Sequence, residues 1–257
     1  MIRNNKLIDI VRIGFSLAKV TFRLRIENSY LGVFWYLLNP LILFFILYSV
    51  RQAAFSGEEI PFFSLYLLLG IAGFNFMKSV ITGAIDVISS NPDYIKSINR
   101  VAPESLVVSV VFHSFFSHIF EFIMVIALSL YLGAPLVGLL AYPVVLLIFS
   151  LLLLGVAFIF SSVGTYVSDL NNIWLIVSQL LLLATPIFYV IYPGSILYFI
   201  NLFNPLFYFL EIVRPLVIYG KMPANFLLST FSGFTIIYLA VGVAVFRHFK
   251  KKFAELI

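Results

Sequence analysis

The chain has 257 residues, of which 62% are hydrophobic and 11% charged, and its mean hydropathy is +1.10. This composition excludes a soluble globular protein and predicts a polytopic membrane protein with one domain over residues 1–257. The absence of cysteine excludes disulfide frameworks and cysteine-based metal or redox sites. The net charge of +5 is not a nucleic-acid signal here, because in a membrane protein the positions of Lys and Arg report topology.

The first 28 residues contain a predicted amphipathic helix from Leu7 to Arg25. Its polar residues recur every three or four positions and oppose an apolar stripe that includes Val11 and Phe15. A basic face opposite a Phe, Ile and Leu face suits a helix lying in the membrane surface. Two interpretations remain, a simple interfacial anchor and an anchor that also docks a cytoplasmic partner.

Six segments are predicted to cross the membrane. They are Val33 to Val50, Phe62 to Ile85, about Glu104 to Leu130, about Leu136 to Val163, about Ile173 to Tyr192, and Phe226 to Phe246. Pro186, which follows Thr185, removes a backbone hydrogen bond and is expected to bend the fifth span. The chain then divides into an interface helix (1–28), spans one to five (33–192), a region without a span (193–225), and span six with a basic tail (226–257).

The stretch from Asn201 to Gly220 is apolar but too interrupted to cross the bilayer. A span needs about 20 uninterrupted apolar residues, and Pro205, Glu211, Arg214 and Pro215 break every candidate run. On a helix, Glu211 and Arg214 share a face and can pair. Such a segment enters the membrane and returns, or lies at its interface, and it needs shielding wherever its helix breaks.

Two short helices have clear start signals. Asn91 precedes Pro92, with Asp93 favourably placed against the helix dipole, and Asn204 precedes Pro205 in the same manner. The first helix lies in the loop between spans two and three and is expected to end by Pro103. It is either a solvated loop helix or a docking element for a soluble subunit.

The basic residues support six spans. With six spans, the side that holds both termini carries Arg3, Lys6, Arg12, Lys19, Arg23, Arg25, Lys78, Lys96, Arg100, Arg247, Lys250, Lys251 and Lys252. The other side carries only Arg51, Arg214 and Lys221. This asymmetry predicts that both termini and the helix from Asn91 to Arg100 are cytoplasmic, whereas a seventh span would place the C-terminal lysines outside.

The sequence contains few groups suited to chemistry. Gly220-Lys221 lacks the upstream glycine and the following Ser or Thr of a phosphate-binding loop, so ATP binding by that route is excluded. His113 and His118 are five residues apart and make a poor shared metal site. His118 and Glu121, near the expected membrane midplane, form either a proton relay or catalytic site, or a structural polar contact.

The structural interpretation of His118 and Glu121 is favoured, because no other span carries a second carboxylate or a basic partner. In that case Glu121 is neutral, or satisfied by Ser114, by Ser117 or by a neighbouring helix.

The aromatic residues, 18% of the chain, also allow two interpretations. Phe34, Trp35 and Tyr36 at the inner end of span one fit an interfacial belt, as do Tyr189, Tyr192 and Tyr198 at the outer end of span five. Their rings would equally suit a sugar conduit.

Several motifs now converge along nearly the full length. They are Arg23-Leu24-Arg25 with Ser29-Tyr30-Leu31-Gly32, Trp35 and Asn39-Pro40-Leu41; Asn91 to Arg100 with Pro103-Glu104; Thr185-Pro186-Ile187-Phe188-Tyr189; and Asn204-Pro205-Leu206 with Glu211 and Arg214. In this order the set resembles the permease subunit of bacterial ABC exporters of polysaccharides, the O-antigen, capsule and teichoic-acid group. The length favours the O-antigen type. Ser168 before Asp169 departs from the pattern, since relatives often have Arg there.

The resemblance implies an all-α integral membrane protein with re-entrant periplasmic helices between spans five and six, located in the bacterial cytoplasmic (inner) membrane. It implies a homodimer with two nucleotide-binding subunits, which hold ATP and Mg and hydrolyse the ATP. It implies no cofactor, metal or catalytic residue in this chain itself. It further implies that lipid-linked polysaccharide passes through a channel lined by spans one and five.

The resemblance also assigns residues to roles. Those that couple to the nucleotide-binding subunit are Asn91, Pro92, Asp93, Tyr94, Lys96 and Arg100. Those at the entry of the lipid head group are Arg12, Lys19, Arg23 and Arg25. Those that line the channel are Phe34, Trp35, Tyr36 and Tyr189. Those of the re-entrant gate are Asn204, Pro205, Glu211 and Arg214.

Two alternative functions remain open from the sequence. One is a permease for teichoic acid, capsule or a drug-like substrate. The other is a membrane-embedded glycosyltransferase or acyltransferase that uses His118 and Glu121. The enzyme is disfavoured because the polar residues are scattered along the chain rather than clustered toward one cavity.

Overall fold

A computed structural model describes residues 6–27, 30–54, 60–96 and 102–253, and every regular element in these ranges is a helix. The helices are α1 (Lys6–Glu27), η1 (Gly32–Phe34), α2 (Trp35–Ala54), α3 (Phe63–Asp86), α4 (Pro92–Lys96), α5 (Pro103–Leu132), α6 (Leu136–Gly164), α7 (Leu170–Ala184), α8 (Ile196–Asn201), α9 (Pro205–Tyr219), α10 (Asn225–Phe249) and η2 (Lys250–Lys252). The all-α prediction is confirmed.

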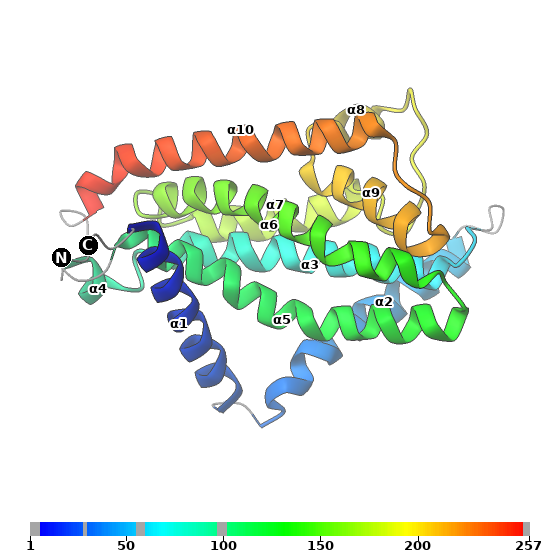
Figure 1. The fold of residues 1–257 in the computed structure, drawn as a ribbon, viewed down its shortest axis with the longest axis horizontal. Coiled ribbons are helices and arrows are strands. Elements are labelled where there is room, and N and C mark those ends of the chain that lie inside the picture. Colours follow the sequence, from blue (N-terminus) through cyan, green and yellow to red (C-terminus); the bar gives the residue numbers. More distant parts are fainter. Residues whose placement is uncertain (1–5, 28–29, 55–59, 97–101, 254–257) are drawn as a thin grey trace.

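The long helices form one elongated bundle (Figure 1). Helices α3, α5, α6, α7 and α10 run along its long axis, while α1 and α2 form a V on one side of it. The start of α1, helix α4 and the end of α10 lie at one end of the bundle. The end of α9 and the start of α3 lie at the opposite end.

Among the described residues, five helices are long and apolar enough to cross a membrane, and they correspond to five of the six predicted spans. They are Gly32–Ala53, Phe63–Asp86, Pro103–Leu132, Leu136–Gly164 and Asn225–Lys252. Helix α7 is apolar but has only 15 residues. At 1.5 Å per residue it is about 22 Å long, less than the ~30 Å hydrocarbon core. A sixth crossing therefore stays a prediction.

Helix α7 ends where the fifth span was expected to bend. The prediction that the helix continues beyond Pro186 to Tyr192 is wrong, because Thr185 adopts an extended conformation with φ −78° and ψ 140°. The ring of a proline disfavours α conformation in the residue before it. The chain after Pro186 instead folds back against α3, where the Tyr66 hydroxyl donates to the Tyr189 carbonyl at 2.9 Å.

The short helix α4 begins at Pro92 as predicted, but Pro103 has a different role from the one expected. Pro103 is the first residue of α5, and Ala102 before it is extended with φ −72° and ψ 128°. Proline fits that first position because its missing N–H would have no intrahelical partner there. Arg100 and the side chain of Lys96 lie outside the described residues.

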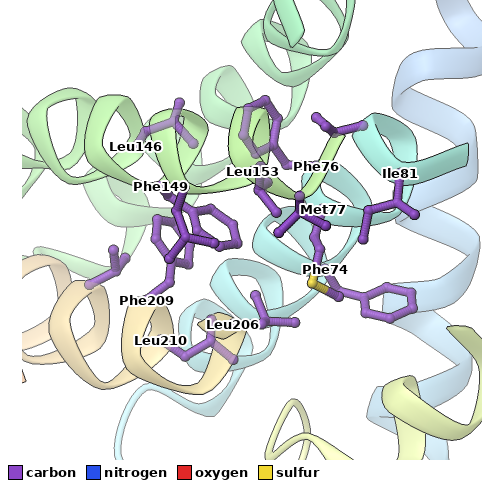
Figure 2. Packing of buried hydrophobic residues seen from close by; sticks show 14 of the residues in the cluster. Phe74, Phe76, Met77, Ile81, Leu146, Phe149, Leu153, Leu206, Phe209 and Leu210 are labelled. Atoms are coloured by element: carbon purple, nitrogen blue, oxygen red, sulfur yellow. The ribbon is translucent and has the colours of Figure 1, made fainter. Parts of the chain in front are cut away.

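The core forms around α6, which contacts α3, α5, α9 and α10. In Figure 2, Phe149 of α6 meets Phe209 of α9, and their stacked rings have centroids 4.4 Å apart. Glycines bring α6 and α10 into backbone contact, since a Cβ on Gly155 would overlap the Tyr238 carbonyl and one on Gly242 would overlap the Gly155 carbonyl. Small residues at such crossings allow the close van der Waals packing that holds membrane helices together.

Helix α9 is packed into this core although it is too short and too interrupted to span. Its predicted cap is confirmed, because the Asn204 side chain accepts a hydrogen bond from the Leu206 N–H at 3.1 Å and Pro205 occupies the first helical position. Asn204 also donates to the Thr185 hydroxyl at 2.8 Å. That bond ties the start of α9 to the end of α7.

Candidate functional site

A cavity of about 900 Å³ is lined by residues of α1, η1, α2, α3 and α5. Polar side chains cover much of its wall although the surrounding helices are apolar. Those from α3 are Asn75, Lys78, Ser79 and Thr82, and those from α5 include Ser109, His113, Ser114, Ser117, His118 and Glu121. Polar surface at this depth is tolerated where it lines a cavity that holds water or a polar guest.

Helical spacing explains why these residues meet. Asn75, Ser79 and Thr82 are four and three residues apart, so they share one face of α3. On α5, Ser114, Ser117 and Glu121 follow the same rule. Along the sequence these polar residues look scattered, but the two stripes meet where α3 packs against α5, and both line the cavity. The repeat within each span was the signal that could have found them.

The cavity wall contains two basic side chains and two polar atoms that lack a hydrogen-bond partner. Arg25, from the last turn of α1, and Lys78 of α3 both line it. The Arg25 guanidinium carbon lies 5.7 Å from the centroid of the Tyr36 ring. The Tyr36 hydroxyl and the His113 Nε2 atom are buried without a hydrogen-bond partner, although both residues face the cavity. Buried polar atoms normally have a partner, so these two are available to a polar guest.

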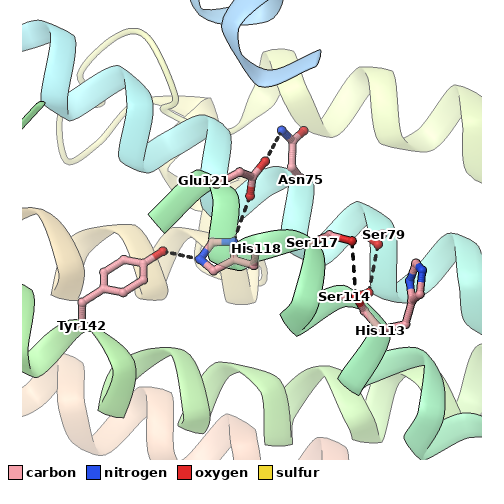
Figure 3. A network of polar contacts seen from close by, with 8 residues as sticks. All are labelled: Asn75, Ser79, His113, Ser114, Ser117, His118, Glu121 and Tyr142. Carbon is pink, nitrogen blue, oxygen red and sulfur yellow. Dashed lines mark hydrogen bonds and ion pairs between the residues drawn. The ribbon is translucent and has the colours of Figure 1, made fainter. Parts of the chain in front are cut away.

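A chain of hydrogen bonds runs from the cavity wall into the core (Figure 3). Asn75 Nδ2 donates to Glu121 Oε1 at 2.7 Å, and Glu121 Oε2 lies 2.9 Å from His118 Nδ1. His118 Nε2 lies 2.8 Å from the Tyr142 hydroxyl on α6. Both ring nitrogens of His118 are therefore engaged, and the residue is only 2% exposed.

These hydrogen bonds distinguish between the two interpretations of His118 and Glu121. Glu121 finds its partner on a neighbouring helix, at Asn75, rather than at Ser114 or Ser117. Ser114 instead bonds Ser79 at 2.9 Å. A fully partnered network across α3, α5 and α6 supports a structural role, since such networks rigidify a core when every member is satisfied.

Helix α1 forms as predicted and is covered on one side by α5. Gly14 and Ala18 are buried there, and a Cβ on Gly14 would lie 2.8 Å from Val108 Cγ1 of α5. Val11 and Phe15 remain exposed at 49% and 46%. The helix thus keeps an open apolar side beside its polar side, as a surface-lying membrane helix requires.

The four basic residues predicted at the head-group entry divide into two groups. Arg12, Lys19 and Arg23 are exposed on the polar side of α1, where Arg12 pairs with Asp9 at 3.1 Å and Arg23 pairs with Glu27 at 2.7 Å. Arg25 points elsewhere and lines the cavity. The predicted channel-lining residues divide in the same way.

Trp35 and Tyr36 line the cavity. Phe34 is 68% exposed, and the Tyr189 hydroxyl donates to the Leu183 and Ala184 carbonyls at 2.7 and 2.8 Å. The structure therefore brings Trp35 and Tyr36, but not Phe34 and Tyr189, to the polar cavity of a single chain.

Helix α4 presents two of the predicted coupling residues at the end of the bundle. Asp93 and Tyr94 are exposed, whereas Ile95 is 3% exposed and anchors the helix to the core. Asn91 Nδ2 donates to the Val87 carbonyl at 2.8 Å. Asn91 and Tyr94 also line the cavity, so the exposed helix adjoins its wall.

The pairing of Glu211 with Arg214 is not formed. Arg214 Nη2 donates instead to the Ile187 carbonyl at 3.1 Å and to the Tyr66 carbonyl at 3.4 Å. The guanidinium carbon lies 3.4 Å from the centroid of the Tyr66 ring. Within the described part of the chain no ion pair joins Arg214 to Glu211. The side chain reaches across to α3 rather than back along α9.

The sequence matches the ABC-2 type transporter family over residues 14–218. It is also similar to the O-antigen export system permease protein RfbA of Myxococcus xanthus, with 24% identity over 254 residues that cover 93% of each chain. The family match extends from the buried face of α1 to the end of α9, so it includes every helix that lines the cavity. This chain therefore belongs to the ABC-2 type transporter family.

Proposed function

We propose that this chain is the transmembrane subunit of an ABC exporter that carries lipid-linked polysaccharide of the O-antigen type across the bacterial cytoplasmic membrane. Two copies of the chain assemble with two nucleotide-binding subunits, which hydrolyse ATP with Mg. The chain itself is a transport subunit and not an enzyme. The similarity to an O-antigen export permease over 93% of both chains supports this substrate class.

The polar cavity is the observation that carries the proposal. An amphiphilic substrate needs a polar compartment for its head group, and this compartment must be reachable from the membrane surface. The cavity lies beside α1, whose exposed Arg12, Lys19 and Arg23 favour an anionic surface by about 1 kcal/mol per basic residue near it. Arg25 and Lys78 continue that positive charge along the cavity wall.

Helix α4 and the predicted topology support a cytoplasmic ATPase partner. The exposed Asp93 and Tyr94 adjoin the cavity wall through Asn91, so a push on α4 acts directly on the lining. In our proposal the nucleotide-binding subunit contacts this helix and transmits its ATP-driven movement there. The re-entrant residues Asn204 and Pro205, which start α9, belong to the exit at the other end.

A deletion of the gene tests the proposal, with surface glycan and cytoplasmic lipid-linked glycan measured in the same cells. We expect glycan to be lost from the surface and to accumulate inside, and both pools to recover when the wild-type chain is restored. Glycan absent from both pools would indicate synthesis and favour the transferase. Unchanged pools would refute polysaccharide export and leave another ABC substrate.

A further inference from the structure

A second cavity, of about 590 Å³, lies at the end of the bundle opposite α4. It is lined by α9, by the start of α3 and by the non-helical chain that follows α7. Its polar lining consists of Tyr66, Tyr192, Glu211, Arg214 and Tyr219. The volume falls within the range of small-molecule sites in proteins, about 300–1,000 Å³. It shares no lining residue with the first cavity.

Arg214 supplies this cavity with unused hydrogen-bond donors. The residue is 4% exposed, and its Nη2 atom already bonds the Ile187 and Tyr66 carbonyls. Its Nε and Nη1 atoms are buried and have no partner. A buried charged donor without a partner is costly, and native proteins keep few of them. Structural support of Ile187 uses only Nη2, so it does not account for the other two nitrogens.

The fold makes room for this guanidinium. A Cβ on Gly70 of α3 would lie 3.0 Å from Arg214 Nη2 and 3.0 Å from Ile187 Cγ2, which is tighter than most contacts of real Cβ atoms. The Tyr66 ring lies against the guanidinium with a centroid distance of 3.4 Å. Arg214 is therefore held in place from two sides while Nε and Nη1 stay unbonded.

Glu211 brings a hydrogen-bond acceptor to the same cavity. It lies one turn before Arg214 on α9, lines the cavity and forms no ion pair with Arg214. Burial raises the pKa of the Glu211 carboxyl, against the opposing effect of the Arg214 charge. An anion would bond Arg214 but be repelled by Glu211. A neutral ligand with several hydroxyl groups can accept from Arg214 and donate to Glu211 at once.

Two tyrosines at the rim of the cavity complete a surface suited to binding a saccharide. Tyr192 is 58% and Tyr219 is 43% exposed, and both line the cavity. Aromatic rings offer a large apolar surface together with a polar hydroxyl, which suits a ligand with C–H faces and hydroxyl edges.

We propose that this outer cavity binds one or two neutral hexose units of the exported glycan, with Arg214 as donor and Glu211 as acceptor. The identity of the ligand as glycan rests on the proposed function, whereas the recognition chemistry rests on the cavity. The site holds a segment of glycan as it leaves through the end of the bundle opposite α4.

Saturation-transfer NMR on the full chain in lipid nanodiscs tests this site. The probe is the lipid-free oligosaccharide released by mild acid from the surface polysaccharide of the source cell. We expect transfer to sugar ring protons with the wild-type chain, and binding about tenfold weaker for Arg214→Met and for Glu211→Gln, because each removes a charge-assisted hydrogen bond. Lys221→Met, which removes an exposed cation just after α9, is the matched control and should bind as wild type.

Thermal unfolding identifies variants that fold poorly, and Glu211→Gln remains informative if Arg214→Met does not fold. Equal transfer to the wild type and to a folded Glu211→Gln variant would overturn the site. Absence of transfer to the wild-type chain would also overturn the site. If deletion of the gene nevertheless abolishes surface glycan, the proposed function still stands. A strain whose surface glycan does not depend on the gene would instead overturn the proposed function.

Discussion

Tyr142 and His118 show how single polar side chains are accommodated inside this apolar bundle. Tyr142 is 1% and His118 2% exposed, and their rings stack with centroids 5.9 Å apart while they share a hydrogen bond. The sequence marked His118 and Glu121 as a pair worth explaining, but neither Asn75 nor Tyr142 was expected as a partner. Those partners come from other helices, and spacing along one helix carries no information about them.

Tyr142→Phe tests whether this network is structural. Removal of the hydroxyl leaves His118 Nε2 buried without a partner, which costs about 1–3 kcal/mol of unfolding free energy. Denaturant titration of the purified chain measures that loss. Export per folded molecule should stay at the wild-type level, and Tyr131→Phe, at an 86% exposed position of α5, should change neither quantity. Export lost at full stability would support a proton relay instead.

Gly155 shows how one missing side chain sets a helix crossing. Gly155→Ala places a methyl group against the Tyr238 carbonyl of α10, so α6 and α10 must separate. We expect a loss of about 1–3 kcal/mol, the usual cost of overpacking. Fluorescence-detected thermal unfolding in detergent measures it. Gly233→Ala on α10 is the matched control, because a Cβ there meets nothing within 4 Å. Equal melting of the two variants would contradict this packing.

At the scale of elements, α4 is short, exposed and attached through one buried residue. Asp93→Lys combined with Tyr94→Ser changes its exposed surface and keeps the Ile95 anchor. In the complex with the nucleotide-binding subunits, we expect ATP hydrolysis to continue while export stops, because movement no longer reaches the permease. Paired assays of ATPase activity and export measure this. Met222→Ser, 81% exposed in the segment that follows α9, serves as control. Coupled export at the wild-type rate would refute the docking role.

Local signals predicted the elements unevenly. Asn204 with Pro205 marked the start of α9 correctly, because a cap and a first-turn proline act within a few residues. A proline can end one helix or begin the next, and only the fold shows that Pro103 begins α5. Thr185-Pro186 was expected to bend a span, but α7 stops there because the residue before a proline disfavours α conformation and Thr185 is extended.

At the scale of the whole molecule, most of the surface of α2 is not covered by other helices of the same chain. Only 11% of its most apolar 18-residue stretch is buried, compared with 72% for the corresponding stretch of α3, which contacts both α2 and α7. Exposed apolar side chains continue along α7, including Leu180 at 61% and Leu183 at 59%. In the homodimer that we propose, the faces of α2 and α7 meet a second copy.

The absence of cysteine allows a direct test of that dimer. Single cysteines at Phe45 of α2 or Leu180 of α7 should cross-link two chains under mild oxidation, because residues near a twofold axis approach their own copies. The product is a dimer band on a non-reducing gel. A cysteine at Ile237 of α10, which is 58% exposed, should stay monomeric. Cross-links from Ile237 and none from the other two positions would place the interface on α10.

The sequence by itself determined the membrane class, five helices of spanning length and the amphipathic helix α1. These depend on composition and on apolar repeats within single segments, which no distant contact can cancel. Tertiary structure alone decided that Asn75 bonds Glu121, that Arg214 bonds Ile187 and Tyr66 rather than Glu211, and that two polar stripes line one cavity. Those outcomes depend on how each helix is rotated and how closely it packs, and in a bundle the packing between helices sets both.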